Sequence, residues 1–170
     1  TGMPADCPAS VQLTINELEY QQPGTDSTEY LELFGPGNQS LNGFQLTFYN
    51  GNGNTSYLTV DLTGDSIPPD GYFVVGSQAA PNVDKIITAA GGGSTNIIQN
   101  EGSSGADGIV LSFSGPGLGS PIIVEGFAYG GPGTNGFTPI DGVAAGVFLS
   151  TIGVRDGNNT TLQKLPDGNS

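Results

Sequence analysis

Five carboxylates lie close together near the start of the chain, where they could act as acids, bases or metal ligands. They are Glu17, Glu19, Asp26, Glu29 and Glu32. A pair of carboxylates is the machinery of glycoside hydrolysis. However, the chain has no tryptophan to form a sugar platform, and it has three basic residues in all to stabilise a developing anion. We therefore expect these acids to be non-catalytic.

Nucleophilic catalysis is disfavoured for a separate reason. The chain has no histidine and a single cysteine, Cys7, in a proline-containing N-terminal segment. Triads of the Ser/His/Asp and Cys/His kinds need a histidine as the base that activates the nucleophile. The residue inventory thus predicts a protein that is not an enzyme.

Calcium is the cofactor that the acids could serve, because hard cations take carboxylate and carbonyl oxygens from loops. Asp26 lies in a Pro-Gly loop and Glu29 follows that loop, and these two residues are the candidate ligands. Their spacing matches neither the EF-hand loop nor the glycine-rich calcium repeat. The alternative is that Asp26 caps its own turn, while Glu29 and Glu32 are solvated or accept hydrogen bonds from the backbone. We expect no cofactor, with calcium at these two residues left open.

Charge narrows the choice of partners. Sixteen acids against Lys85, Arg155 and Lys164 give a formal net charge of −13. Nucleic-acid binding requires a basic footprint, so DNA, RNA and anionic lipid surfaces are excluded as partners. The sequence shows no transmembrane pattern and no signal peptide. An exported protein would have lost its signal.

The N-terminal arm, residues 1–10, has no hydrophobic periodicity. Its Cys7 and Pro8 are candidate interaction residues. Cys7 is either a spare thiol in a flexible arm or an intermolecular crosslink in an oxidising compartment. Since the chain has few lysines to guard its strand edges, the arm could also add as a strand to the sheet of a neighbouring molecule.

Four glycosylation sequons are present, and the composition of the chain makes such triplets frequent by chance. They begin at Asn38, Asn54, Asn158 and Asn159.

The elements that must position these residues are short strands. Val11, Leu13 and Ile15 alternate with polar residues, which predicts a strand with one face in a core. A strict period of two would bury Glu17 and expose Leu18. Because a buried lone carboxylate is costly, we expect a bulge near Asn16 and Glu17.

The remaining chain shows similar short segments separated by Gly, Pro, Asn and Asp turns. After residues 11–20, the expected strands are residues 29–34, 43–50, 57–62, 72–76, 83–88, 107–113, 121–129, 143–152 and 160–165. In residues 43–50, Phe44 and Phe48 should face the core while Tyr49 faces water. No segment has helical spacing. About nine or ten short strands at regular spacing predict one antiparallel β-sandwich over residues 11–170.

The segment INELEYQQPGTDSTEYLELF, residues 15–34, resembles the opening signature of the lamin tail domain family. Residues 105–113 and 122–131 resemble the family's second half, and TLQKLPDG, residues 161–168, resembles its closing segment. The resemblance implies an immunoglobulin-like sandwich without catalytic activity, of a kind that occurs in lamins and in exported bacterial proteins.

These observations predict a secreted or cell-surface structural protein, for example an adhesive protein or a filament or surface-layer subunit. It would bind copies of itself or another extracellular protein through exposed strand edges and the N-terminal arm. Two alternatives stay open: a calcium-dependent binding module, and an accessory domain of a secreted hydrolase.

Overall fold

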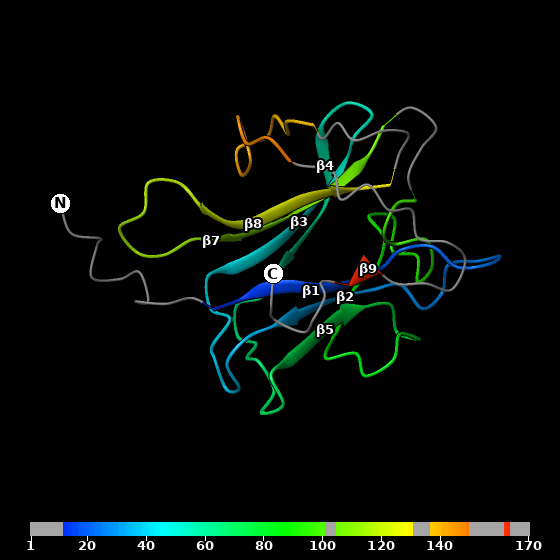
Figure 1. Cartoon of the computed structure of the whole chain (residues 1–170), viewed down its shortest axis with the longest axis horizontal. Coiled ribbons are helices and arrows are strands. Elements are labelled where there is room, and N and C mark those ends of the chain that lie inside the picture. Colours follow the sequence, from blue (N-terminus) through cyan, green and yellow to red (C-terminus); the bar gives the residue numbers. More distant parts are fainter. Residues whose placement is uncertain (1–11, 101–104, 131–136, 150–161, 164–170) are drawn as a thin grey trace.

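The computed structural model describes residues 12–100, 105–130, 137–149 and 162–163. These residues form an all-β sandwich of two facing sheets and contain no helix (Figure 1). The described part of the chain therefore also lacks any helix that could cross a membrane. The expected N-terminal arm, residues 1–10, lies outside the described residues.

Within the described residues, nine strands make up the two sheets, and two of these strands have two described residues each. The first sheet has the order β6 (Lys85–Ile86), β5 (Tyr72–Gly76), β2 (Tyr30–Phe34), β1 (Thr14–Glu19) and β9 (Leu162–Gln163). The second has the order β4 (Thr55–Asp61), β3 (Phe44–Asn50), β7 (Asp107–Phe113) and β8 (Ile122–Tyr129). Among the described strands, every pairing is antiparallel except that of β5 with β6, which is parallel.

The strand order is immunoglobulin-like. Strands β1, β2 and β5 stand where an immunoglobulin domain has A, B and E, and the order β4-β3-β7-β8 reproduces C′-C-F-G. Along the described strands, the chain crosses between the sheets four times: after β2, after β4, between β6 and β7, and between β8 and β9. The parallel β6 takes the edge position that strand D occupies in those domains.

The predicted bulge in β1 is present. Ile15 pairs with Leu33 and Glu17 pairs with Glu32, so Asn16 is the extra residue. The shift lets Ile15 and Leu18 both enter the core, at 2% and 1% exposure, while Glu17 stays half-buried and accepts the Tyr30 hydroxyl at 2.9 Å. The bulge thus resolves the conflict that strict alternation would create.

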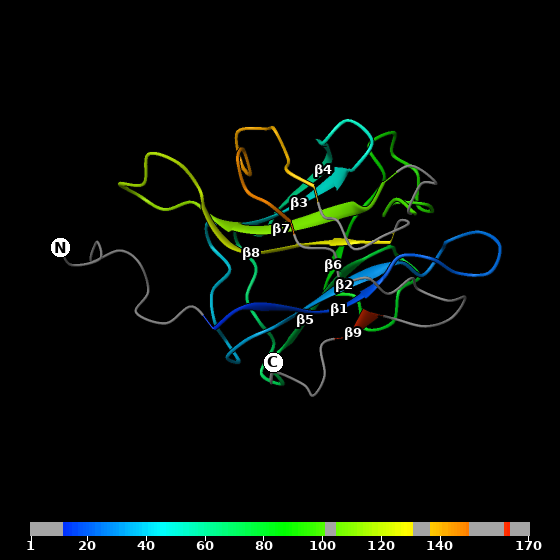
Figure 2. The same cartoon turned by 45° about the horizontal axis from the view of Figure 1, so that its top comes forward.

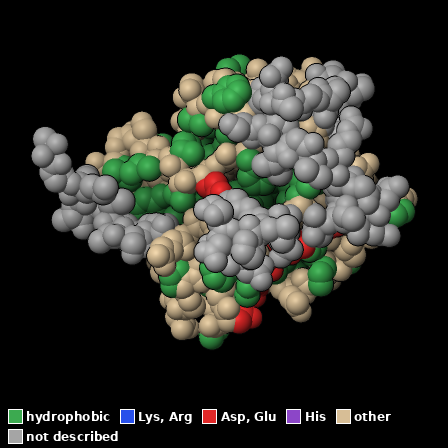
Figure 3. Space-filling view, viewed as in Figure 1, with side chains coloured by type: hydrophobic (Ala, Val, Ile, Leu, Met, Phe, Trp, Pro, Cys, Tyr) green, Lys and Arg blue, Asp and Glu red, His purple; other side chains and the backbone are tan. Residues whose placement is uncertain are grey.

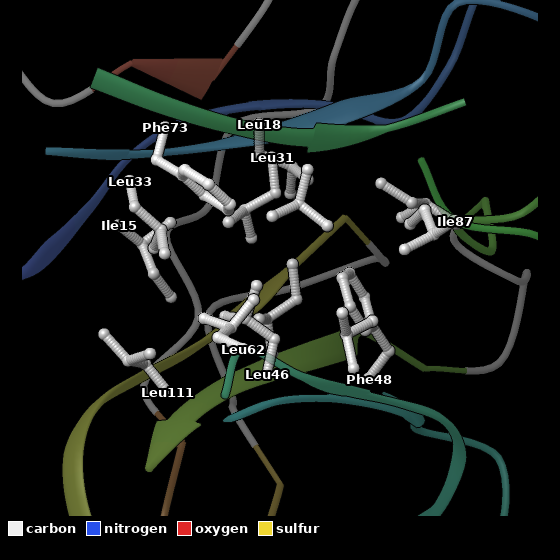
Figure 4. Close-up of a cluster of buried hydrophobic side chains, with 14 of the residues drawn as sticks. Ile15, Leu18, Leu31, Leu33, Leu46, Phe48, Leu62, Phe73, Ile87 and Leu111 are labelled. Atoms are coloured by element: carbon white, nitrogen blue, oxygen red, sulfur yellow. The ribbon is translucent and has the colours of Figure 1, made fainter. Parts of the chain in front are cut away.

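The main core lies between the sheets. Figure 4 shows side chains of the first sheet, such as Leu31 and Phe73, pointing toward Leu46, Phe48 and Leu111 of the second. All of them are at most 3% exposed. Burial at about 25 cal/mol per Å² of apolar surface makes this layer the main source of stability.

The outer face of the second sheet is also covered, which contradicts the expected exposure of Tyr49. Tyr49 is fully buried in a second apolar cluster with Val110, Ala128 and Leu149. The cover is residues 137–149, drawn orange, on the side of the second sheet facing away from the first (Figures 1 and 2). Alternation assigned Tyr49 to the correct face but could not reveal that a later segment covers it.

The prediction of a strand at residues 143–152 was wrong for residues 143–149, the part that the structure describes. The chain turns there, and Leu149 makes an isolated bridge to Phe137. Asp141 Oδ1 fixes the turn by accepting the backbone N–H groups of Val143 and Ala144, each at 3.0 Å. The apolar residues of this stretch pack onto a sheet face instead of extending a sheet.

Candidate functional site

The carboxylate of Glu29 holds a distant segment in the core. Its side chain is fully buried immediately before β2. Oε2 accepts the backbone N–H of Ile97 at 2.7 Å, and Oε1 accepts that of Ile98 at 2.9 Å. Both isoleucines are at most 2% exposed. Glu29 therefore satisfies two backbone donors of a segment that has no strand partner of its own.

Asp26 is held in the same way at the β1–β2 loop. Its Oδ1 accepts the backbone N–H of Gln22 at 2.6 Å, and its Oδ2 accepts the side-chain amide of Asn100 at 2.7 Å. The Asp26 carbonyl accepts the N–H of Asn96 at 2.9 Å. Gln22 Oε1 in turn accepts the N–H groups of Ser27 and Thr28. These bonds join the β1–β2 loop to residues 96–100.

Tyrosines complete this end of the sandwich. Tyr57 accepts the backbone N–H of Gln99 at 3.0 Å, and Tyr129 donates its hydroxyl to the Gln99 carbonyl at 2.9 Å. The ring of Tyr129 packs on that of Tyr20, with centroids 4.6 Å apart. Burial raises the pKa of both Tyr57 and Tyr129, so these hydroxyls stay protonated.

Burial also raises the pKa of Glu29 to about 7. The two backbone N–H groups oppose this rise, whereas the nearby charges of Asp26 and Glu19 add to it. A carboxyl with a pKa near neutrality could act as a general base. Because both oxygens of Glu29 are already bonded to backbone and the side chain is fully buried, the geometry makes it a structural acceptor.

The two calcium candidates, Asp26 and Glu29, influence each other through their charges, but each carboxylate has its own hydrogen-bond partners. All four oxygens of Asp26 and Glu29 accept hydrogen bonds from the protein. No group of three His, Cys, Asp or Glu residues in the described ranges is arranged to hold a metal ion. Asp26 accepts a backbone N–H of its own loop and Glu29 accepts two backbone N–H groups, as one form of the alternative described above would have it.

The sheet edges differ in how they are protected. β6 has two residues and is too short to template a new strand. β8 is longer, but it has a bulge in its pairing with β7. From β8 the Glu125 carboxylate also crosses to β1, where it accepts the Ile15 N–H at 2.7 Å and the Thr14 hydroxyl at 2.9 Å. Bulges and turned-in charges are known devices against edge pairing.

The edge strand β4 has fewer such devices. It contains no lysine and no proline, and its one charged residue is Asp61 at its end. A bulge lies near Tyr57, but residues 58–61 pair regularly with β3. The Leu62 N–H donates to the Phe44 carbonyl at 3.0 Å, which shows which residues of β4 direct their backbone groups toward β3. By alternation, the backbone groups of Thr59 then point away from β3.

Surface charge is one-sided in the described chain. The face in Figure 3 shows Asp and Glu side chains but no Lys or Arg among the residues drawn in colour. Lys85, the one basic residue in the described ranges, forms an ion pair with Asp65 at 2.6 Å. The exclusion of nucleic acid drawn from the net charge remains a prediction.

Two of the four sequons can be placed. Asn38 and Asn54 both have positive φ, 66° and 56°. Asparagine is among the few residues that tolerate this conformation, which accounts for both without a glycan. Asn158 and Asn159 lie outside the described residues, as do Cys7 and Pro8.

Sequence reasoning missed two polar residues that the fold uses. Glu125 lies within an apolar stretch and gave no sign that it would bond β1. The bulge at Asn16 was expected, but the burial of the Asn16 side chain, at 3% exposure, was not.

Comparison with known proteins found no match. The chain matched no family model, no curated protein and no solved structure. The described residues define a protein of the immunoglobulin-like β-sandwich class. Membership of the lamin tail domain family stays a prediction from the motifs.

Proposed function

We propose that the chain is a non-catalytic extracellular structural or interaction protein that associates with copies of itself through the exposed edge of β4 and its N-terminal arm. The observation that carries the proposal is the contrast among the edges. β8 is bulged and turns Glu125 inward, whereas residues 58–61 of β4 present a regular edge without lysine or proline. Such an edge favours strand addition.

The arm has a sequence suited to pairing on one side. In an extended strand, successive backbone N–H groups alternate between the two edges. Pro4 and Pro8 fall on the same edge because they are four residues apart. The other edge keeps the N–H groups of residues such as Ala5 and Cys7. An arm of this kind can add to one sheet while its second edge is blocked by proline.

Deleting residues 1–10 tests the role of the arm. Light scattering coupled to size-exclusion chromatography should find the full chain assembled at high concentration and the deleted chain monomeric. The same oligomeric state for the two chains would count against the proposal, whether both are assembled or both are monomers.

The edge is tested by replacing Thr59, which is exposed and whose N–H points outward. Thr59→Pro removes that N–H and should abolish assembly while the fold is kept, since proline is tolerated at an outward-facing edge position. Thr59→Val is the matched control, because it keeps the N–H and the β-branched shape. Assembly by Thr59→Pro at the level of Thr59→Val would show that this edge is not the interface.

A further inference from the structure

Three Asn-Gly pairs lie at the two ends of β3. They are residues 42–43, 50–51 and 52–53, and a fourth pair, residues 135–136, lies outside the described residues. In such a pair the backbone nitrogen of the glycine can attack the asparagine side chain, because glycine has no Cβ to obstruct the approach. The attack needs an asparagine amide and a glycine N–H that are both free to move. The surroundings of these two groups therefore decide which pair reacts.

The side chain of Asn42 is held in place. Its Oδ1 accepts the backbone N–H of Gly64 at 2.8 Å, which links it to the turn after β4. The following glycine is fixed as well. The Gly43 N–H donates to the Thr63 hydroxyl at 3.4 Å, and the Gly43 carbonyl accepts the Ser114 N–H at 2.8 Å. Both reacting groups of this pair are thus restrained by residues remote in sequence.

Asn50 is restrained in a different way. Its Oδ1 accepts the backbone N–H of Asn52 at 2.7 Å. The Gly51 N–H donates to Oδ1 of the buried Asp107 at 2.9 Å. A carboxylate at this position opposes the loss of the proton, because like charges repel and the nitrogen would become negative. The second pair is therefore protected by charge as well as by position.

Asn52 lacks such restraints. Its side chain is exposed and has no hydrogen-bond partner in the part of the chain that the structure describes. Gly53 is also exposed, and the nearest atom to a Cβ built there is Thr55 Oγ1, at 3.9 Å. The Gly53 N–H donates to the Gly51 carbonyl at 3.1 Å, across a three-residue turn centred on Asn52 itself. This bond is local to the loop, so local motion of the loop is enough to break it.

We propose that Asn52 is a site of spontaneous deamidation through a cyclic imide formed with the Gly53 nitrogen. This nitrogen loses its proton to hydroxide and attacks Cγ of Asn52, and the bond between Cγ and Nδ2 breaks with release of ammonia. Water then opens the imide at either carbonyl carbon and gives aspartate or isoaspartate. The net reaction consumes one water, releases one ammonia and uses no oxidant or reductant. The inference does not depend on the proposed self-association.

The modification would change a loop on which two other parts of the fold depend. Residues 51–54 join β3 to the edge strand β4. The Asn54 carbonyl accepts the Ile140 N–H at 3.1 Å, so the same loop also holds the cover, residues 137–149. Deamidation adds a negative charge to this loop, and isoaspartate also lengthens its backbone by one atom.

Peptide mapping of the full chain after incubation at mildly alkaline pH tests the proposal. Each conversion adds about 1 Da, and fragmentation of chymotryptic peptides that contain Asn42, Asn50 and Asn52 assigns it to a residue. A parallel incubation in concentrated urea gives the rate of each site in the unfolded chain. We expect folding to slow Asn42 and Asn50 strongly and Asn52 little, so that Asn52 converts several-fold faster than either in the folded protein.

The variant Asn52→Gln checks the assignment, because glutamine reacts far more slowly through its larger ring. It should remove the fast conversion and leave the slow ones unchanged. The proposal would be overturned if Asn52 in the folded chain converted no faster than Asn42 or Asn50. It would also be overturned if folding slowed all three sites to the same degree.

Discussion

Tyr49 on β3 donates its hydroxyl to Asp141 Oδ1 at 2.9 Å, although the two residues are 92 positions apart. This bond links the outer face of the second sheet to the turn at Asp141, within the segment 137–149 that covers that face. Asp141 uses the same oxygen to accept two backbone N–H groups of that turn. The pKa of Asp141 is lowered because these hydrogen bonds outweigh the effect of burial. Residues 137–149 are thus attached by a charge-assisted network as well as by apolar packing.

Removing the hydroxyl should loosen the cover. We expect Tyr49→Phe to lower the free energy of unfolding by about 1.5–3 kcal/mol, since a hydrogen bond to a charged group contributes about that much. Urea denaturation followed by tyrosine fluorescence measures the effect. Tyr72→Phe, at a half-buried position of β5, serves as a comparison for the loss of a tyrosine hydroxyl elsewhere. An unchanged midpoint for Tyr49→Phe would show that the bond adds nothing to stability.

The cover also depends on a glycine that leaves room for it. A Cβ on Gly108 would lie 2.7 Å from Leu149 Cδ1 and 2.7 Å from Phe137 Cζ. We expect Gly108→Val to displace both side chains at a cost of about 1–3 kcal/mol. Hydrogen exchange should show lost protection of the Leu149 amide, which bonds the Phe137 carbonyl, while Leu46 in the main core stays protected.

Gly119→Ala is the matched control for that experiment. No heavy atom lies within 4 Å of a Cβ at Gly119, and its φ is not in the left-handed region. Its exchange pattern should be that of the unaltered chain. Full protection of Leu149 in Gly108→Val would contradict the packing that the structure describes.

Stability should fall as the pH rises toward 8. The pKa of Glu29 is raised from 4.5 to about 7, so the folded state binds the proton more tightly than the unfolded state. Its contribution is fully present below pH 4.5 and is lost as the pH rises through 7. The change is at most about 3 kcal/mol. Asp141 has a lowered pKa and acts oppositely, with a contribution that is lost on acidification below about pH 4.

The assignment of this slope to Glu29 can be checked with Glu29→Gln. The amide does not titrate, so the fall in unfolding free energy between pH 5 and 8 should disappear. The variant should also be less stable at pH 5, because its Nε2 cannot accept a backbone N–H in the way that Oε1 or Oε2 does. The same slope in both proteins would assign the pH dependence to another group.

Calcium should leave the chain unchanged. To bind Asp26 and Glu29, the ion would have to displace the four hydrogen bonds that these carboxylates accept. We expect no rise in Tm and no heat of binding when calcium is titrated into the full chain. A clear rise in Tm that Asp26→Asn removes would instead favour the calcium-dependent module.

The local pattern of the sequence was sufficient for much of the fold. Residues 72–76 and 107–113 are strands with the expected bounds, because short apolar segments bounded by turn residues have few other stable conformations. The bulge at Asn16 followed from the cost of burying Glu17. The strand prediction for residues 143–152 was wrong over its described residues because apolar residues can cover a sheet as well as extend one, and the local pattern does not distinguish the two.

The sequence by itself determined that this chain forms short strands with alternating faces, that its turns fall at Gly, Asn and Asp, and that it lacks the histidine needed for common catalytic arrangements. Tertiary structure decided what lies against each face and each carboxylate. Burial in the folded chain raises the pKa of Glu29, and the N–H groups of Ile97 and Ile98, which are remote in sequence, partly oppose that rise. Tyr49 is buried because residues 137–149 return to it. A period of two fixes which residues share a face, but only the path of the whole chain fixes what covers that face.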